Sequence, residues 1–134
     1  MNHHSLSYGQ IIILQPDIAE VIIDDGIEMD ESMVDKYHHF LIEHLVAPFS
    51  ILVNKINAYT YTFEAQLKLA TIPHIHSMAV VTYSHISEVA TNSLSNIPRA
   101  TPWNLRTFPH REQALNWLKQ NQQAIRNEDG KPSS

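Results

Sequence analysis

The chain has 134 residues, of which 43% are apolar and 17% are charged, as expected for one globular domain. It contains no cysteine, which excludes disulfides, thiolate zinc ligands and thiol catalysis. The net charge of −5 is uneven, because residues 1–50 hold nine acids and one base whereas residues 51–134 hold five acids and eight bases. We therefore expect no general nucleic-acid-binding surface.

No apolar run approaches the length that a membrane span requires. The opening residues, Met1–Gly9, are polar and do not resemble a signal peptide. We therefore expect a cytoplasmic protein without a membrane span.

The first part of the chain predicts a hairpin followed by a helix. Residues 1–8 are polar and are expected to be loose. Gln10–Leu14 and Ile18–Ile23 are closely spaced apolar runs, which predict an antiparallel hairpin. Asp30 is a good N-cap for an amphipathic helix of about four turns, which ends before Pro48.

Ser50–Val53 is an apolar run that suits a strand buried on both faces of the sheet. Because a helix separates it from the preceding strand, the two strands are candidates for a parallel pair. A second helix is expected from Phe63 to Pro73, and the apolar residues that mark it are Phe63, Leu67, Ala70 and Ile72.

The rest of the chain continues the alternation of strands and helices. A strand over Ser77–Tyr83 precedes a third helix, which Ser84 caps, and a strand over Leu105–Phe108 precedes a final helix over His110–Gln123. The residues of the final helix that should face the core are Ala114, Leu115, Trp117 and Leu118. The order is β-β-α-β-α-β-α-β-α, which predicts an α/β fold with a mixed five-stranded sheet and four helices. We expect one domain over residues 9–126 and a frayed tail over residues 127–134.

Three stretches carry a resemblance to a known family: Gly26–Asp30 leading into a helix, the strand Ser77–Thr82, and Leu105–Leu118. With the order of elements, they resemble the STAS domain and, within it, the small bacterial SpoIIAA-like proteins. The resemblance covers about Gly9 to Gln120. It implies the STAS fold and a non-enzymatic regulatory or protein-interaction module.

In the anti-sigma-factor antagonists of the STAS family, a partner kinase phosphorylates a serine at the start of the helix after the third strand. The matching segment here, Asn57–Phe63, has no serine, and Thr60 and Thr62 are the nearest equivalents. Either threonine could take phosphate or contact a partner at the helix N-terminus. The alternative is that one of them is simply the N-cap.

Aromatic and polar residues around this loop are the other site candidates. Asn57, Tyr59, Tyr61 and Phe63 could form a pocket or a partner-binding patch, or the rings could pack beneath the loop. Trp103 either caps an edge of the core or belongs to an exposed patch used in dimerisation.

Metal and cofactor sites are not predicted. The nine histidines include His74 and His76 on one face of an extended segment, but they form no HExxH or 2-His-1-carboxylate pattern. With three glycines in the chain, no glycine-rich phosphate loop can form. An enzyme would need clustered titratable groups, and the spacing brings no such cluster together.

The favoured function is a non-enzymatic module that binds a protein partner of unknown identity, through the loop after the third strand and the start of the next helix. A second copy of the chain, forming a homodimer, is another candidate partner. The alternative is a carrier of a small apolar or lipid-like ligand between sheet and helices. The carrier predicts a closed apolar cavity near Tyr59, Tyr61 and Phe63, whereas the interaction module predicts an exposed loop over a filled core.

Overall fold

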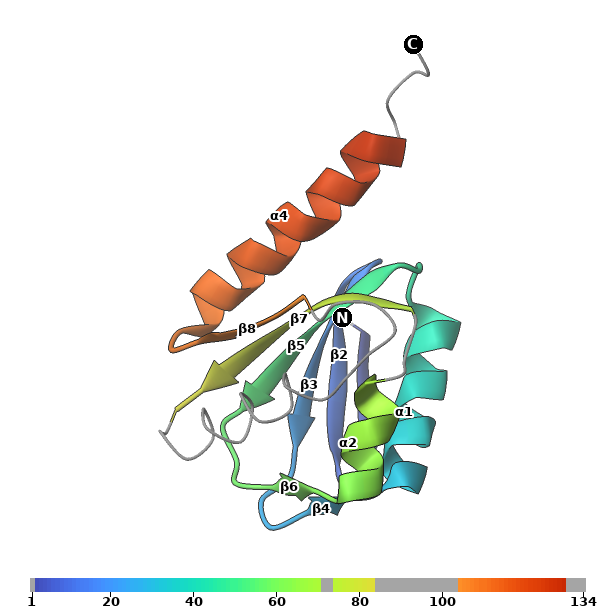
Figure 1. The fold of residues 1–134 in the computed structure, drawn as a ribbon, viewed down its shortest axis with the longest axis vertical. Helices are drawn as coiled ribbons and strands as arrows, with labels where there is room; N and C mark the ends of the chain where they lie inside the picture. The colour runs from blue at the N-terminus through green and yellow to red at the C-terminus, as the bar shows by residue number, and fades with distance from the viewer. Residues whose placement is uncertain (1, 71–73, 84–103, 130–134) are drawn as a thin grey trace.

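A six-stranded mixed sheet forms the centre of the protein (Figure 1). The computed structural model describes residues 2–70, 74–83 and 104–129. The strands lie in the order β1-β2-β3-β5-β7-β8, with the bounds Asn2–Leu6, Gly9–Gln15, Ile18–Ile23, Phe49–Lys55, Ile75–Thr82 and Leu105–Phe108. Strands β1, β2 and β3 pair antiparallel, whereas β3, β5, β7 and β8 pair parallel. The predicted hairpin and the parallel pairing of its second strand with β5 are therefore confirmed.

Strand β1 is a correction to the sequence-based expectation, which leaves residues 1–8 loose and gives the sheet five strands. Polar residues suit β1 because it is an edge strand, whose main contribution is backbone pairing with β2. The turn after β1 then places Tyr8 in the core, where its hydroxyl donates to the carbonyl of Met33 at 2.7 Å. Gly9 is required at the start of β2, because a Cβ there would collide with the carbonyl oxygen of Ile22.

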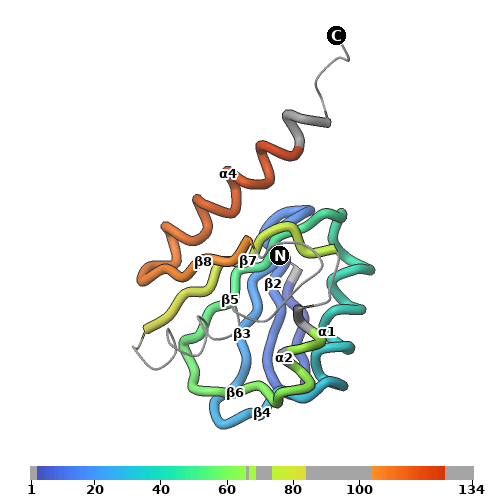
Figure 2. The backbone as a smooth tube through the Cα atoms, in the orientation of Figure 1, coloured from blue at the N-terminus to red at the C-terminus, as the bar shows by residue number. Residues whose placement is uncertain are grey.

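Helices cover both faces of the sheet (Figure 2). Helices α1 (Glu31–His44) and α2 (Phe63–Ala70) contact each other, and α1 packs on the face that carries Ile51 and Val53. Helix α4 (Arg111–Asp129) packs on the face that carries Leu52. Successive side chains of a strand point to opposite faces, so the sheet separates two apolar clusters.

The start of α1 is as predicted. The Asp30 side chain accepts a hydrogen bond from the backbone N–H of Met33 at 2.9 Å, which is the N-cap interaction. At the other end, the N–H of Leu45 donates to the carbonyl of Leu41.

Two short strands, β4 (Glu28–Met29) and β6 (Thr60–Tyr61), form a separate parallel pair that the sequence does not predict. The N–H of Thr60 donates to the carbonyl of Ile27 at 3.0 Å, and the N–H of Thr62 donates to that of Met29 at 2.9 Å. This pairing fixes the segment after β5 against the segment that leads into α1.

Three helices lie among the described residues, and the helix predicted after Ser84 falls outside them, as does Trp103. The final helix is longer than predicted and continues to Asp129. Its inward face continues past Leu118 with Gln122, and no proline or glycine interrupts it before Gly130. None of the helices in this part of the chain is long and apolar enough to cross a membrane.

Candidate functional site

The loop between β5 and α2, which the sequence favours as the site, is held by hydrogen bonds to the end of β3 and the turn after it. Asn57 donates from its side-chain amide to the carbonyl of Ile23 at 3.0 Å. The N–H of Ala58 donates to the Asp25 carboxylate at 3.0 Å, and its carbonyl accepts from Gly26 at 2.7 Å. Gly26 has a φ of 78°, a conformation that favours glycine. Asn57 therefore anchors the loop.

Tyr59 and Tyr61 pack beneath this loop. Their hydroxyl oxygens are 3.4 Å apart, and the two rings meet edge to face with centroids 5.5 Å apart. Both contact the core cluster that includes Tyr37, and burial raises the pKa of Tyr59 and Tyr37 well above the usual tyrosine value. The sequence allows either a pocket or partner-binding patch, or rings that pack beneath the loop. In the structure these two rings pack beneath the loop.

Lys55, the last residue of β5, lies against these tyrosines. Its ammonium nitrogen is 4.6 Å from the centre of the Tyr59 ring and 5.8 Å from that of Tyr61. Lys55 is 7% exposed, and burial lowers the pKa of its amine. No role for Lys55 is predicted from the sequence. The available signal is the strand period of two, because Lys55 continues the inward-facing positions Ile51 and Val53.

The two threonines differ in their surroundings. Thr60 is exposed on β6, whereas Thr62 accepts a hydrogen bond from the N–H of Ala65 at 3.1 Å. Thr62 therefore caps α2, the alternative that the sequence offers for one of the two threonines.

Helix α2 forms at the predicted place, but some of the apolar residues that mark it are exposed. Phe63 is 68% exposed and Leu67 is 42% exposed, whereas Ala65 is fully buried. Two of the apolar residues that mark this helix in the sequence, Phe63 and Leu67, therefore do not face the core.

Replacing Thr62 with alanine should lower the free energy of unfolding by about 1 kcal/mol, because the N–H of Ala65 loses its acceptor. Thr60→Ala is the matched control and should change it by less than about 0.5 kcal/mol, because Thr60 is exposed. Urea denaturation measures both values. Equal losses in the two variants would contradict the capping role of Thr62.

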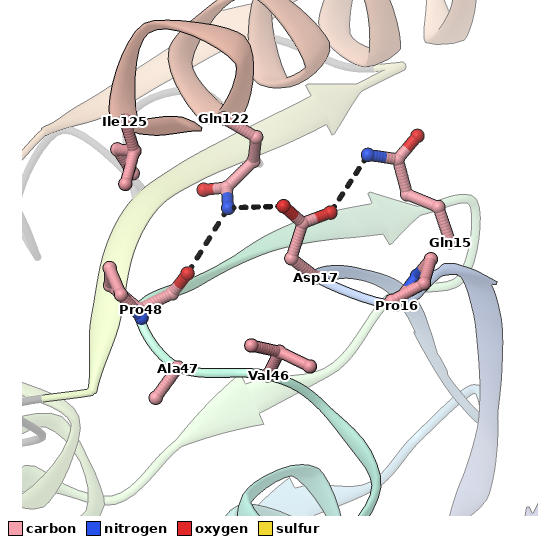
Figure 3. Close-up of a pocket in the computed structure, with 8 residues that line it drawn as sticks. All are labelled: Gln15, Pro16, Asp17, Val46, Ala47, Pro48, Gln122 and Ile125. Atoms are coloured by element: carbon pink, nitrogen blue, oxygen red, sulfur yellow. Dashed lines mark hydrogen bonds between the residues drawn. The ribbon is translucent and has the colours of Figure 1, made fainter. Parts of the chain in front are cut away.

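A pocket of about 440 Å³ lies at the opposite end of the sheet, at the amino ends of β3 and β5 (Figure 3). Its lining residues come from the β2–β3 turn, the α1–β5 connection and α4, and they are Gln15, Pro16, Asp17, Val46, Ala47, Pro48, Gln122 and Ile125. Strand β5 separates this pocket from the Tyr59 loop by roughly 20 Å, at about 3.3 Å per residue. Tyr59, Tyr61 and Phe63 line neither this pocket nor the open acidic groove at the starts of α1 and α2.

Gln122 organises the polar side of this pocket, as Figure 3 shows. The residue is 1% exposed, and its amide nitrogen donates to Asp17 at 2.9 Å and to the carbonyl of Pro48 at 3.1 Å. Ser50 donates its hydroxyl proton to the amide oxygen of Gln122 at 2.5 Å, so Ser77, also 2.5 Å away, must donate to Ser50. This network is not predicted from the sequence, although Gln122 is a polar residue one turn after Leu118 on the inward face of the last helix.

A second buried polar group lies on the same face of the sheet. Glu20, 3% exposed, accepts two hydrogen bonds from Arg111, at 2.7 and 3.0 Å, and one from Asn54 at 2.9 Å. Burial on its own raises the pKa of Glu20, but these hydrogen bonds and the charge of Arg111 outweigh it, and the pKa is lowered. The ion pair between Arg111 and Glu20 joins the start of α4 to the centre of the sheet.

The histidines of the described segments form no group of three or more metal-ligating side chains with Asp or Glu. His38 and His74 have ring centres 5.8 Å apart, and His4 and His44 stack on the two sides of Phe40.

No protein-family model and no curated protein matches the sequence. A solved structure does match the fold: an uncharacterised protein of the DUF3478 family from Shewanella loihica, described as having a SpoIIAA-like fold. The match has a TM-score of 0.57 and 16% sequence identity, and it covers 88% of this chain and 96% of the other. At this identity the likeness concerns the fold. The resemblance read from the sequence is thus confirmed at that level, and the chain has a SpoIIAA-like α/β fold.

Proposed function

We propose that the chain is a non-enzymatic module that binds a partner protein through the loop after β5 and the outer face of α2. The observation that carries the proposal is the exposure of Phe63 and Leu67, at 68% and 42%. The two residues are four positions apart and therefore neighbours on the helix surface. Ile56, at the start of the loop, is 62% exposed as well.

The packing of the tyrosines beneath the loop favours an interaction surface at this place rather than an internal ligand cavity. Tyr59 is 8% exposed and packs with Tyr61 against the main core. The loop itself is fixed through Asn57 and Ala58, so it presents its exposed side chains in one arrangement. A surface that is ordered before binding loses less conformational freedom when it binds.

Charge around α2 indicates the kind of partner. The groove at the starts of α1 and α2 is lined by acidic and hydroxyl side chains, namely Asp30, Glu31, Ser32, Asp35, Thr62 and Glu64. Thr62 and Glu64 flank Phe63 in the sequence, so the apolar side chain adjoins a negatively charged edge. We expect a partner that presents an apolar side chain beside basic residues.

Replacing both Phe63 and Leu67 with serine should weaken partner binding about tenfold or more, while the free energy of unfolding changes by less than about 0.5 kcal/mol for each exposed position. The matched control replaces Ile42 in α1 and Val46 just after α1, which are 39% and 64% exposed and belong to neither the loop nor α2, with serine. Enrichment from host extract identifies candidate partners, and titration of a purified partner gives the affinities. A partner that binds the Phe63/Leu67 variant as tightly as the wild type would contradict the proposal.

A second candidate function is a carrier of a small ligand in the pocket at Gln122. The pocket volume of about 440 Å³ lies in the range of small-molecule sites, and a buried amide forms part of its wall. Native mass spectrometry of protein from its own host separates the candidates. A non-covalent adduct of a few hundred daltons favours the carrier, and a dimer without an adduct favours the interaction module with a second copy as partner.

A further inference from the structure

Lys55 is a buried cation without a counter-ion among the described residues. It is 7% exposed, and it forms no ion pair or hydrogen bond with any residue in segments 2–70, 74–83 and 104–129. Lys68 and Arg111 differ, because they pair with Asp35 at 3.2 Å and with Glu20 at 2.7 Å. A lysine with so little exposed surface usually has a charged partner.

The tyrosine rings account for only part of this arrangement. The faces of Tyr59 and Tyr61 attract the ammonium group. They do not replace hydrogen-bond acceptors, of which an ammonium group can use three. Burial lowers the pKa of Lys55, and no carboxylate of the described residues counters that effect.

The position of Lys55 in the sheet is one where α/β proteins bind ligands. Strand β5 lies between β3 and β7, and Lys55 is at its carboxyl end. In open α/β sheets, ligands bind at the carboxyl ends of the strands. The residues that follow Lys55 include the exposed Ile56 and Ala58, so the chain reaches the surface immediately after it.

We propose that Lys55 binds an oxyanion, a carboxylate or phosphate group, at the carboxyl end of β5, with Tyr59 and Tyr61 holding the ammonium group in place. The oxyanion supplies the acceptors that the described residues do not provide. Such charge-assisted hydrogen bonds are about twice as strong as neutral ones. The inference goes beyond the interaction module, because a free oxyanion needs no partner protein and no contact with Phe63 or Leu67.

The test is NMR titration of the full chain with sodium phosphate and, separately, sodium acetate, with sodium chloride added to hold the ionic strength constant. We expect saturable shifts of the Lys55 side-chain amine and of the Tyr59 and Tyr61 amides. In Lys55→Met the affinity should fall about tenfold or more, because one charge-assisted hydrogen-bonding group is lost. Lys119→Met, at an exposed position of α4, is the matched control and should bind like the wild type.

The wild-type signal of the Lys55 amine keeps the test decisive if Lys55→Met does not fold. Saturation by phosphate alone identifies a phosphoryl ligand, and saturation by both salts identifies an oxyanion that includes carboxylates. Shifts that never saturate, or saturable binding that Lys55→Met retains, would overturn the proposal. Lys55 would then serve only to hold the two tyrosines.

Discussion

Replacing Arg111 with methionine should lower the free energy of unfolding by about 3 kcal/mol at neutral pH, near the low end for breaking a buried ion pair. The reason is the carboxylate that remains, because Glu20 is 3% exposed and, among the residues that the structure describes, would retain only Asn54 as a partner. The low end applies because the Arg111 side chain is itself 40% exposed, so water already screens part of the attraction. Urea denaturation at pH 7 measures the loss.

The pH dependence of this loss distinguishes the buried charge from lost packing. In the wild type the pKa of Glu20 is lowered, so its contribution to stability is present above the unfolded pKa and is lost as the pH falls through the folded pKa. Without Arg111, burial raises the pKa of Glu20 above its unfolded value, so the variant loses stability as the pH rises. The difference between wild type and variant should therefore be largest at pH 7 and shrink toward about pH 4, near the usual glutamate pKa.

A second substitution provides the control. In Glu20→Gln/Arg111→Met the buried group is neutral, so most of the loss seen at pH 7 should be recovered. A double variant as unstable as Arg111→Met, with a loss that does not change with pH, would mean that Arg111 stabilises the protein by packing. The join between α4 and the sheet would then not depend on this ion pair.

The alternation of strands and helices could be predicted because the spacing of apolar residues reflects which side chains are buried. Ile18–Ile23 and the run within β5 are buried on both faces, and Asp30 carries the capping chemistry in its own side chain. Strand β1 has no such apolar pattern, because it is an edge strand of polar residues whose conformation depends on pairing with β2. The pair β4 and β6 likewise exists only once distant segments meet.

The phase of α2 shows why a short helix is harder to orient than a long one. Phe63 and Leu67 are apolar and correctly spaced for an inner face, yet both are exposed, whereas Ala65 is buried. Two turns contain too few positions for periodicity to outweigh one exposed aromatic residue. The same exposure of Phe63 and Leu67 underlies the proposed partner surface.

The candidate site could be located by sequence only at the level of the loop. The hydroxyls and rings of residues 59–62 identify the segment in the sequence. Lys55 looks like the polar end of a strand in the sequence, and only the structure shows that it lies against the tyrosines. Gln122 is similar, because its partners Asp17 and Ser50 are more than 70 residues away in the sequence. Contacts of that kind depend on tertiary structure and leave no local pattern.

Replacing Leu118 with alanine should lower the free energy of unfolding by about 3 kcal/mol, within the usual range of 2–5 kcal/mol for a buried leucine. Leu118 has no exposed surface and belongs to the cluster between α4 and the sheet, with Leu52 and Val81. The loss combines the transfer of apolar surface with a cavity that the strands cannot easily close. Urea denaturation measures the loss. The dependence of the free energy of unfolding on urea concentration should be the same in both proteins.

Leu115→Ala is the control, and it tests how α4 is rotated on the sheet. The sequence places Leu115 among the core residues, whereas the structure leaves it half-buried at the edge of the same cluster. Its loss should therefore be about 1 kcal/mol, well below that of Leu118, because less apolar surface leaves water on folding. The reverse order would mean that α4 is rotated from the orientation described, and the contacts of Gln122, one turn after Leu118, would then have to be reassigned as well.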